Sequence, residues 1–143
     1  MPEPLVDPLV RFFVNSTSCV PPFVQLAGVA ALSGPQDEPR AMVEEFRSRR
    51  ELVVAGLNEL PGVSCRVPRG AFYAFPNVAE VPLDADVLAD RLLQDAGVAV
   101  LAGSAFGRVG TDNLRISYAN SRENLARALE RMVDFLEGLM TTA

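Results

Sequence analysis

Few side chains of this 143-residue sequence could carry reaction chemistry. The sequence has no histidine, and all 13 of its basic residues are arginines. The absence of histidine excludes histidine general bases, serine–histidine triads and histidine metal sites. The absence of lysine excludes a covalent imine between a side chain of this chain and a carbonyl cofactor. The carboxylates show no pairing that singles out an acid and a base, so no catalytic residue and no metal ligand is predicted.

The segment 113–120 holds the most informative side chain. Strand periodicity places Leu114, Ile116 and Tyr118 on one face and Arg115 on the other. A solvated arginine on a half-exposed strand is the ordinary explanation, because exposed arginines are common. The functional explanation is a fixed guanidinium that binds a carboxylate, because this group is planar, charged and bidentate. The residues alone leave both explanations open.

Two glycine-containing segments could lie near such a site. Gly70–Tyr73 places a glycine before two aromatic residues, which is typical of a bend that leads into a strand. Residues 102–107 form a loop whose glycines permit unusual backbone angles near a ligand. No phosphate-binding fingerprint is present in either segment, and each taken alone indicates only a bend or a loop.

Composition and charge narrow the partners. Apolar residues make up 49% and charged residues 22%, which is typical of a globular protein, and the net charge of −5 disfavours nucleic acid. The apolar stretch 19–32 contains Pro21 and Pro22 and is shorter than the ~20 residues of a membrane span. We therefore expect a cytoplasmic protein without nucleic-acid or membrane partners. Cys19 and Cys65 are expected to be small core residues in a reducing compartment.

Hydrophobic spacing and helix-ending residues predict the elements that position these side chains. From Val63 the predicted order is β-β-α-β-β-α, an α/β fold of the α+β two-layer sandwich kind. The helix predicted at residues 22–32 is apolar nearly all round, so we expect it to be buried. Helices are predicted at residues 5–14, 22–32, 39–60, 84–96 and from 120 to the C-terminal end, and strands at 63–67, 71–75, 98–101 and 114–118.

Several segments in order resemble one family. The chain resembles the C-terminal part of a pyridoxal-phosphate-dependent aminotransferase of class I/II, in the aspartate aminotransferase superfamily of fold type I. Ala102 departs from the pattern, because the family usually has a proline there. The resemblance lies in Pro2–Leu5, Asn15–Cys19, the long helix, Pro68–Tyr73, Ala96–Val100, Gly103–Gly107, and Asn113–Tyr118 leading into Asn124-Leu125.

The resemblance implies roles for particular residues. It makes Arg115 the ligand of the α-carboxylate of an amino acid or 2-oxo acid. Phe72 and Phe106 then line the cleft, and the turn Asn15–Ser18 lies near a dimer interface, close to the neighbouring subunit's cofactor. The resemblance implies that residues 1–35 end the large cofactor-binding domain, that 36–61 form an interdomain helix and that 62–143 form the small C-terminal domain.

The resemblance also implies a parent enzyme longer than this chain. The parent moves an amino group between an amino acid and a 2-oxo acid, uses pyridoxal 5′-phosphate and works as a homodimer. Its cofactor-binding lysine lies upstream of this chain, in the missing N-terminal large domain, so we expect the isolated chain to be inactive and to bind no cofactor productively. The alternative is a free-standing ferredoxin-like module that binds a small molecule or regulates without catalysis, which leaves the apolar stretch 23–32 unexplained.

Overall fold

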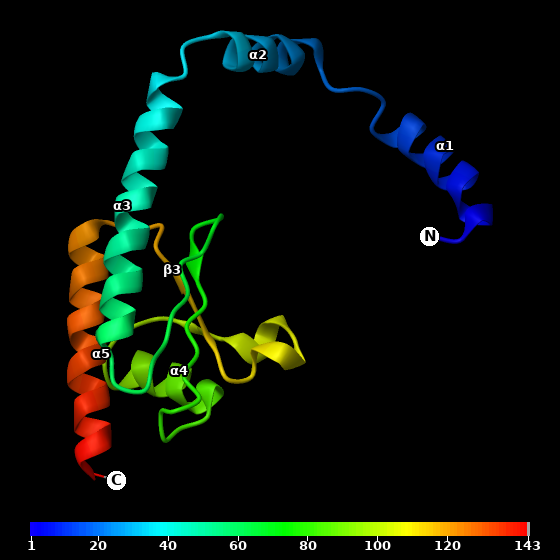
Figure 1. Cartoon of the computed structure of the whole chain (residues 1–143). Helices are drawn as coiled ribbons and strands as arrows, with labels where there is room; N and C mark the ends of the chain where they lie inside the picture. Colours follow the sequence, from blue (N-terminus) through cyan, green and yellow to red (C-terminus); the bar gives the residue numbers. More distant parts are fainter. Residues whose placement is uncertain (143) are drawn as a thin grey trace. The chain divides into compact units, whose positions relative to one another are not determined.

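Two helices make up the first of two units into which contacts divide the chain. The structure is a computed structural model that describes residues 1–142, and the first unit is Met1–Arg40. After a 3-10 turn η1 (Glu3–Leu5) come α1 (Val6–Ser16) and α2 (Pro22–Ser33) (Figure 1). Pro22 stands in the first turn of α2, where the N–H that proline lacks would have no helical partner.

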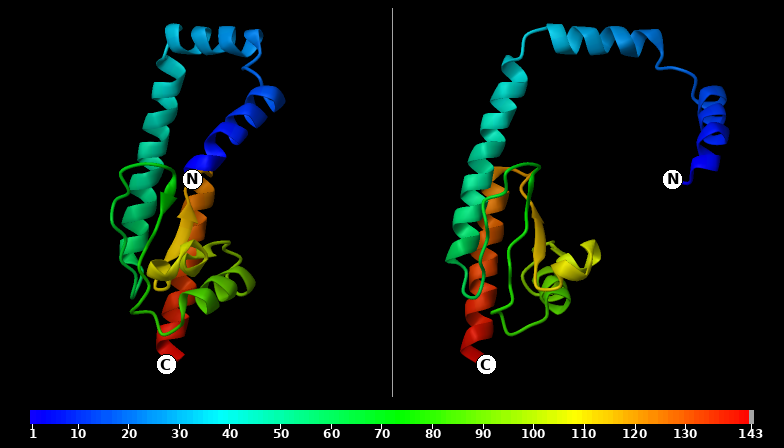
Figure 2. Two further views of the ribbon diagram at one scale, coloured as in Figure 1. Left: turned by 90° about the vertical axis from the view of Figure 1, so that its right-hand side faces the viewer. Right: turned by 45° about the vertical axis from the view of Figure 1, so that its right-hand side comes forward.

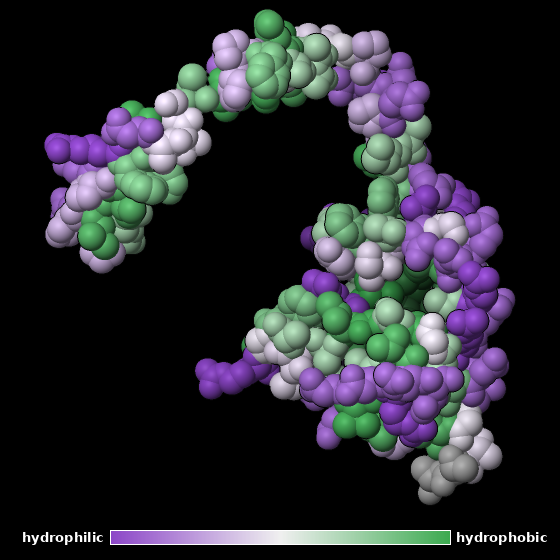
Figure 3. All heavy atoms as spheres, turned by 180° about the vertical axis from the view of Figure 1, so that it is seen from behind, coloured by the Kyte–Doolittle hydropathy of each residue, from purple (hydrophilic) through white to green (hydrophobic). Residues whose placement is uncertain are grey.

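The apolar side chains of the first unit are exposed. Neither α1 nor α2 has a buried residue, and Phe23 is 74% exposed. Figure 3 shows hydrophobic residues on the surface of both helices. The expected burial of α2 is therefore not provided by residues 1–142. Cys19 is exposed and Cys65 is buried, so the prediction of two core cysteines is wrong for Cys19.

The second unit begins at Ala41, within the long helix α3 (Asp37–Glu59). Its sheet has the order β1 (Tyr73–Ala74), β3 (Leu114–Ser117), β2 (Leu101–Ala102), and both pairings are antiparallel. The central strand β3 faces β1 through the pair Tyr73 and Ser117, and it faces β2 through the pair Leu101 and Arg115. The elements are α3 (Asp37–Glu59), β1 (Tyr73–Ala74), α4 (Ala85–Gln94), β2 (Leu101–Ala102), η2 (Gly103–Phe106), η3 (Arg108–Gly110), β3 (Leu114–Ser117) and α5 (Arg122–Thr142).

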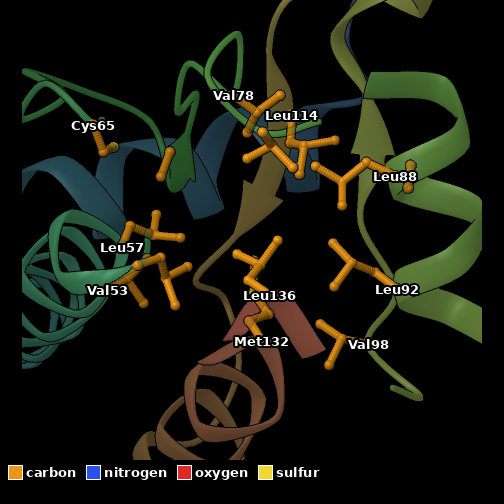
Figure 4. Close-up of a cluster of buried hydrophobic side chains, with 14 of the residues drawn as sticks. Val53, Leu57, Cys65, Val78, Leu88, Leu92, Val98, Leu114, Met132 and Leu136 are labelled. Carbon is orange, nitrogen blue, oxygen red and sulfur yellow. The ribbon is translucent and has the colours of Figure 1, made fainter. Parts of the chain in front are cut away.

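The core of the second unit lies where three helices meet β3. Figures 1 and 2 show α3 and α5 side by side. Figure 4 shows side chains from these two helices and from α4 pointing toward one another around β3. This packing of helices on a small antiparallel sheet confirms the predicted α+β fold. The fully buried members include Val53 and Leu57 of α3, Leu88 and Leu92 of α4, Leu114 of β3, and Leu136 of α5.

The predicted strand at residues 63–67 is wrong. Only Ser64 pairs with a neighbouring segment, in an isolated bridge to Asn77. The Asn58 side chain bonds the Cys65 backbone instead: its Oδ1 accepts from the Cys65 N–H at 2.8 Å, and its Nδ2 donates to the Cys65 carbonyl at 3.0 Å. A side chain of α3 thus bonds the backbone N–H and carbonyl groups that a neighbouring strand would otherwise have bonded.

Two other boundaries differ from the prediction. The strand predicted at 98–101 is β2 at Leu101–Ala102, because the Val98 N–H donates to the Leu92 carbonyl at the end of α4. The helix predicted from residue 120 is α5, which begins at Arg122 and is capped by Ser121, whose Oγ accepts from the Asn124 N–H at 3.2 Å. Because the segment 63–67 forms no strand, residues 1–142 contain three strands, one fewer than the predicted order β-β-α-β-β-α has.

A bidentate ion pair joins α3 to the start of α5. Arg122 Nη2 lies 2.5 Å from Glu45 Oε2, and Arg122 Nε donates to Glu45 Oε1 at 3.1 Å. Arg49 Nε donates to the same Oε1 at 2.8 Å. Hydrogen bonds from Arg122 and then Arg49 lower the pKa of Glu45 from 4.5 to about 2.

Among residues 1–142, no helix combines the length and hydropathy that crossing a membrane requires.

The Glu45 pair predicts how stability depends on acid. The pKa of Glu45 is about 2 in the fold and 4.5 in its absence, so the unfolded chain takes up the proton first as pH falls. The contribution of the pair is therefore complete above pH 4.5 and is lost toward pH 2. Thermal unfolding at a series of pH values should show a smaller loss of stability across this window for Glu45→Gln than for the wild type. Glu44→Gln is the matched control, because Arg47 of the same helix is the only partner of Glu44 among the described residues. An equal change in both variants would contradict the assignment.

Candidate functional site

Arg115 lies in the central strand with its side chain on the face opposite the core. Its neighbours Leu114 and Tyr118 are 1% and 2% exposed, whereas Arg115 is half-buried. Ile116, the third residue predicted on the inner face, is half-buried and packs against the core. The alternation predicted for this strand therefore appears in the structure. Because a strand is rigid, the Arg115 backbone is held more firmly than a loop would hold it.

Two aromatic rings stack on the Arg115 guanidinium. The guanidinium carbon lies 4.5 Å from the centroid of the Tyr73 ring and 4.3 Å from that of Phe106. Tyr73 reaches it from β1, where it pairs with Ser117 and so shares the face of Arg115. Phe106 reaches it from η2. Contacts of this kind contribute about 0.5–2 kcal/mol each, enough to orient the guanidinium plane.

No protein carboxylate neutralises Arg115 in the described chain. Among residues 1–142, no Asp or Glu oxygen lies within 4.0 Å of its nitrogens, and no hydrogen bond from its guanidinium is found. Other arginines, such as Arg49 and Arg91, do pair with carboxylates. A guanidinium has five N–H donors in a planar fork. Arg115 therefore offers an oriented cation to an acceptor from outside the described chain.

The loop that carries Phe106 is held by close backbone packing. The Gly103 N–H donates to the Asn113 carbonyl at 2.7 Å, and the backbones of Gly103 and Gly110 touch. The Phe75 ring lies against both glycines and packs edge-on to Phe106, with centroids 6.4 Å apart. This packing fixes the position of η2 and hence of the Phe106 ring over Arg115.

One side-chain hydrogen bond and one backbone angle further define this loop. Ser104 Oγ donates to Asp86 Oδ1 of α4 at 2.7 Å, which ties the loop to that helix. Ala102 stands where the family pattern has proline, and its φ is −64°, the value that a proline ring imposes. The loop thus has the backbone angle of the proline pattern without the ring.

Phe72 contacts the site through Tyr73 and not through Arg115. The rings of Phe72 and Tyr73 have centroids 4.5 Å apart, and Phe72 also packs on Phe46 of α3 at 6.1 Å. Behind them the Tyr118 hydroxyl donates to the Ala71 carbonyl at 2.9 Å. Burial raises the pKa of the Tyr118 hydroxyl, which keeps it a proton donor.

Sequence reasoning named Arg115, Phe106 and Phe72, included Tyr73 in a candidate segment without giving it a role, and missed Phe75. The register between β1 and β3 could have identified Tyr73 and Phe75, because residues opposite Ser117 and Arg115 lie on the same face of the sheet as Ser117 and Arg115. That register requires knowing which strands pair.

The turn Asn15–Ser18 lies in the first unit, at the exposed end of α1. Within residues 1–142, no cluster of His, Cys, Asp or Glu could hold a metal ion.

The site is a stack on the sheet face and not a deep cavity. A cavity of about 330 Å³ lies between α5 and residues 97–100, and Arg115 does not line it. Arg127 and Arg131 of α5 border that cavity. Arg127 donates to Asn124, and Arg131 donates to the Gly97 carbonyl at 3.5 Å, so each has an acceptor within the fold.

The chain is similar in sequence to known proteins. The family described as aminotransferase class I and II matches residues 10–132. An aspartate aminotransferase of Rhizobium meliloti is 44% identical over 142 residues, which cover 92% of this chain and 34% of that protein. An aspartate aminotransferase of Pyrococcus horikoshii is 36% identical over 139 residues, covering 96% of this chain and 36% of that protein. The chain therefore spans about one third of the length of these curated relatives. This share agrees with the expected resemblance to one part of such an enzyme.

Solved structures agree with the sequence matches. The crystal structure of the aspartate aminotransferase from Rhizobium meliloti matches with a TM-score of 0.81 and 41% identity, over 95% of this chain and 36% of that one. The aromatic aminotransferase from Pyrococcus horikoshii matches with a TM-score of 0.83 and 36% identity, over 96% of this chain and 37% of that one.

Close packing at Gly103 predicts the effect of a single methyl group. A Cβ at Gly103 would meet the Gly110 carbonyl, the Asn113 carbonyl at 2.8 Å and the Phe75 ring at 2.9 Å. Gly103→Ala should therefore destabilise the fold by about 1–3 kcal/mol, measured by urea unfolding. Gly70→Ala is the matched control, because a Cβ there meets nothing within 4 Å. Equal stability of the two variants would contradict the packing described for this loop.

Proposed function

The chain belongs to the class I and II aminotransferase family, and from this premise we propose that Arg115 binds the α-carboxylate of the amino acid and 2-oxo acid between which the full-length enzyme moves an amino group. One observation carries the proposal. The Arg115 guanidinium is oriented by Tyr73 and Phe106, yet no carboxylate within residues 1–142 lies at ion-pair distance. A cation that the fold orients but leaves without a counter-ion is suited to an anionic ligand.

The names of the relatives support a carboxylate ligand and leave the amino acid open. The similar proteins include aspartate, alanine and aromatic aminotransferases. Aspartate, alanine and the aromatic amino acids differ in their side chains and share the α-carboxylate and α-amino groups. A residue that recognises the shared carboxylate is therefore compatible with each of these names. Selection among side chains then falls to residues other than Arg115.

The rings that stack on Arg115 also shape its binding edge. Tyr73 and Phe106 cover faces of the guanidinium, so water and ligands approach it along its N–H edge. A carboxylate meets that edge with two parallel hydrogen bonds, which fixes the carboxylate plane as well as its position. Removing water from the faces strengthens the attraction between the two charges. Arg115 thus binds and orients the substrate and takes no part in proton transfer.

The residues of this chain do not fit pyridoxal phosphate by themselves. The family implies this cofactor in the parent enzyme, where covalent attachment needs a lysine amine, and this sequence contains no lysine. We propose that the other two thirds of the parent supply the lysine and the phosphate-binding groups. In this proposal, residues 1–35 belong to the large domain, 36–61 form the interdomain helix and 62–143 form the small domain. We further propose that the parent is a cytoplasmic homodimer, which would cover the exposed apolar surfaces of α1 and α2.

Substitution of Arg115 tests the binding role. In the full-length parent, Arg115→Ala should raise KM for both amino acid and 2-oxo acid, because a bidentate charged contact is lost. The expected loss is about 2–4 kcal/mol, or roughly 30- to 1,000-fold. Arg115→Lys should also be impaired, because lysine lacks the planar fork. Steady-state kinetics with Arg108→Ala as the control should show wild-type KM for that exposed arginine of η3, and an unchanged KM in Arg115→Ala would overturn the role.

The absence of lysine predicts that the isolated chain is inactive. Because the chain has no lysine, its only primary amine is the N-terminal one. Arginine cannot replace lysine, because its guanidinium stays protonated. The pure chain mixed with pyridoxal phosphate and reduced with borohydride should give no side-chain adduct by peptide mapping, and no amino acid should be turned over. An adduct at the N-terminus without turnover agrees with this prediction. Turnover together with a stoichiometric adduct would show that the chain is a complete enzyme.

A further inference from the structure

We propose that Tyr118 is a positioning residue for the carboxylate site, holding the Gly70–Ala71 turn so that Tyr73 stacks on Arg115. The inference rests on the proposed role of Arg115 and adds a residue that touches neither the substrate nor Arg115. A hydrogen bond from its buried hydroxyl to the Ala71 carbonyl, and the ring contacts of Phe72 with Tyr73 and of Tyr73 with Arg115, connect Tyr118 to the guanidinium.

Tyr118 holds two consecutive carbonyl groups. Its hydroxyl donates to the Ala71 carbonyl at 2.9 Å, and its backbone N–H donates to the Phe72 carbonyl, also at 2.9 Å. The first bond joins residues 47 positions apart in sequence. Tyr118 itself is only 2% exposed and packs on Phe46 of α3, with ring centroids 6.4 Å apart. The donor is therefore fixed by the core, and the turn is bonded to it.

The turn needs such a bond because Ala71 has an unfavourable backbone angle. Its φ is +57°, in the left-handed region where a Cβ is crowded by the carbonyl oxygen. Ala71 and Ser18 are the two residues other than glycine with positive φ in the described chain. Ala71 is exposed, so packing of its methyl group does not hold the angle. The hydrogen bond from Tyr118 to its carbonyl is the contact that can offset the cost.

The conformation of Ala71 sets the direction of the two aromatic residues that follow. Phe72 packs on Phe46 and on Tyr73, and Tyr73 stacks on Arg115. If Ala71 relaxed to a negative φ, the chain entering β1 would change direction at the residue before Phe72. The Tyr73 ring would then leave the guanidinium, and Arg115 would lose one of the two contacts that orient it.

The 143-residue chain itself allows a test that needs no cofactor. The Arg115 Nε–Hε resonance, assigned by its loss in Arg115→Lys, reports the stacked rings through their ring-current shift. In Tyr118→Phe, which removes only the hydroxyl, this resonance should move toward the position of exposed arginines. Titration with propionate, a simple monocarboxylate, should show affinity weakened about two- to tenfold, the range that one net hydrogen bond supplies.

Two substitutions at Ala71 separate the turn from the core. Ala71→Pro forces a negative φ at an exposed position, so it should shift the Arg115 resonance as Tyr118→Phe does without altering core packing. Ala71→Gly accepts a positive φ at no steric cost and should leave the resonance unchanged. Asn58→Ala is the control for lost stability, because its side-chain amide bonds the backbone of Val54 and Cys65. It should lower the melting temperature without moving the Arg115 resonance.

The outcomes distinguish this inference from the proposed function. An unchanged Arg115 resonance in folded Tyr118→Phe or in folded Ala71→Pro would overturn the positioning role. A shift of equal size in Asn58→Ala would also overturn it, because general loosening would then explain the change. If the wild-type resonance does not respond to propionate but does respond to Tyr118→Phe, the carboxylate role fails while the positioning of Arg115 by Tyr118 stands.

Discussion

Stacking between the Arg115 guanidinium and two aromatic rings joins the proposed carboxylate site to the folded core. One ring comes from β1, which pairs with β3, and the other comes from η2, which is bonded to Asn113 directly before β3. The same strand sends Leu114 and Tyr118 into the core. Packing on one face therefore determines where the charge lies on the other face, and the site has no separate support of its own.

Arg115 has no carboxylate partner among residues 1–142, although the chain as a whole is acidic. The net charge of the chain is −5, and it has 18 acidic residues for 13 arginines. Five other arginines pair with carboxylates, and Glu45 accepts from two of them, Arg122 and Arg49. Exposed arginines such as Arg108 also have no carboxylate partner among the described residues, so the stacked rings, and not the missing partner alone, distinguish Arg115. At Arg115 aromatic rings cover the faces of the guanidinium and leave its N–H edge open. Aromatic faces attract a guanidinium without neutralising it, so the charge stays available to a ligand.

Sequence periodicity predicted the elements that depend on local pattern. Helices α3, α4 and α5, the strand at Arg115 and the outward direction of that side chain were predictable, because spacing of apolar residues determines them. The strand at 63–67 was not, because its pattern is that of a strand while its bonds come from the Asn58 side chain. The roles of Tyr73 and Phe75 were missed for a related reason. Their place beside Arg115 depends on pairing between segments about forty residues apart, which no local pattern encodes.

The connection between β2 and β3 has a consequence for how such sequences can change length. Gly103 bonds to Asn113 and packs against Gly110, so the segment closes on itself at a set number of residues. Side chains alternate along β3, and one inserted or deleted residue after Gly110 that slipped its register would turn Arg115 inward and a leucine outward. Insertions and deletions that preserve the site are therefore confined to segments outside this closed loop, such as the turn that follows α3. In an evolutionary comparison, the spacing from Gly103 to Arg115 should vary less than the identity of the residues within it.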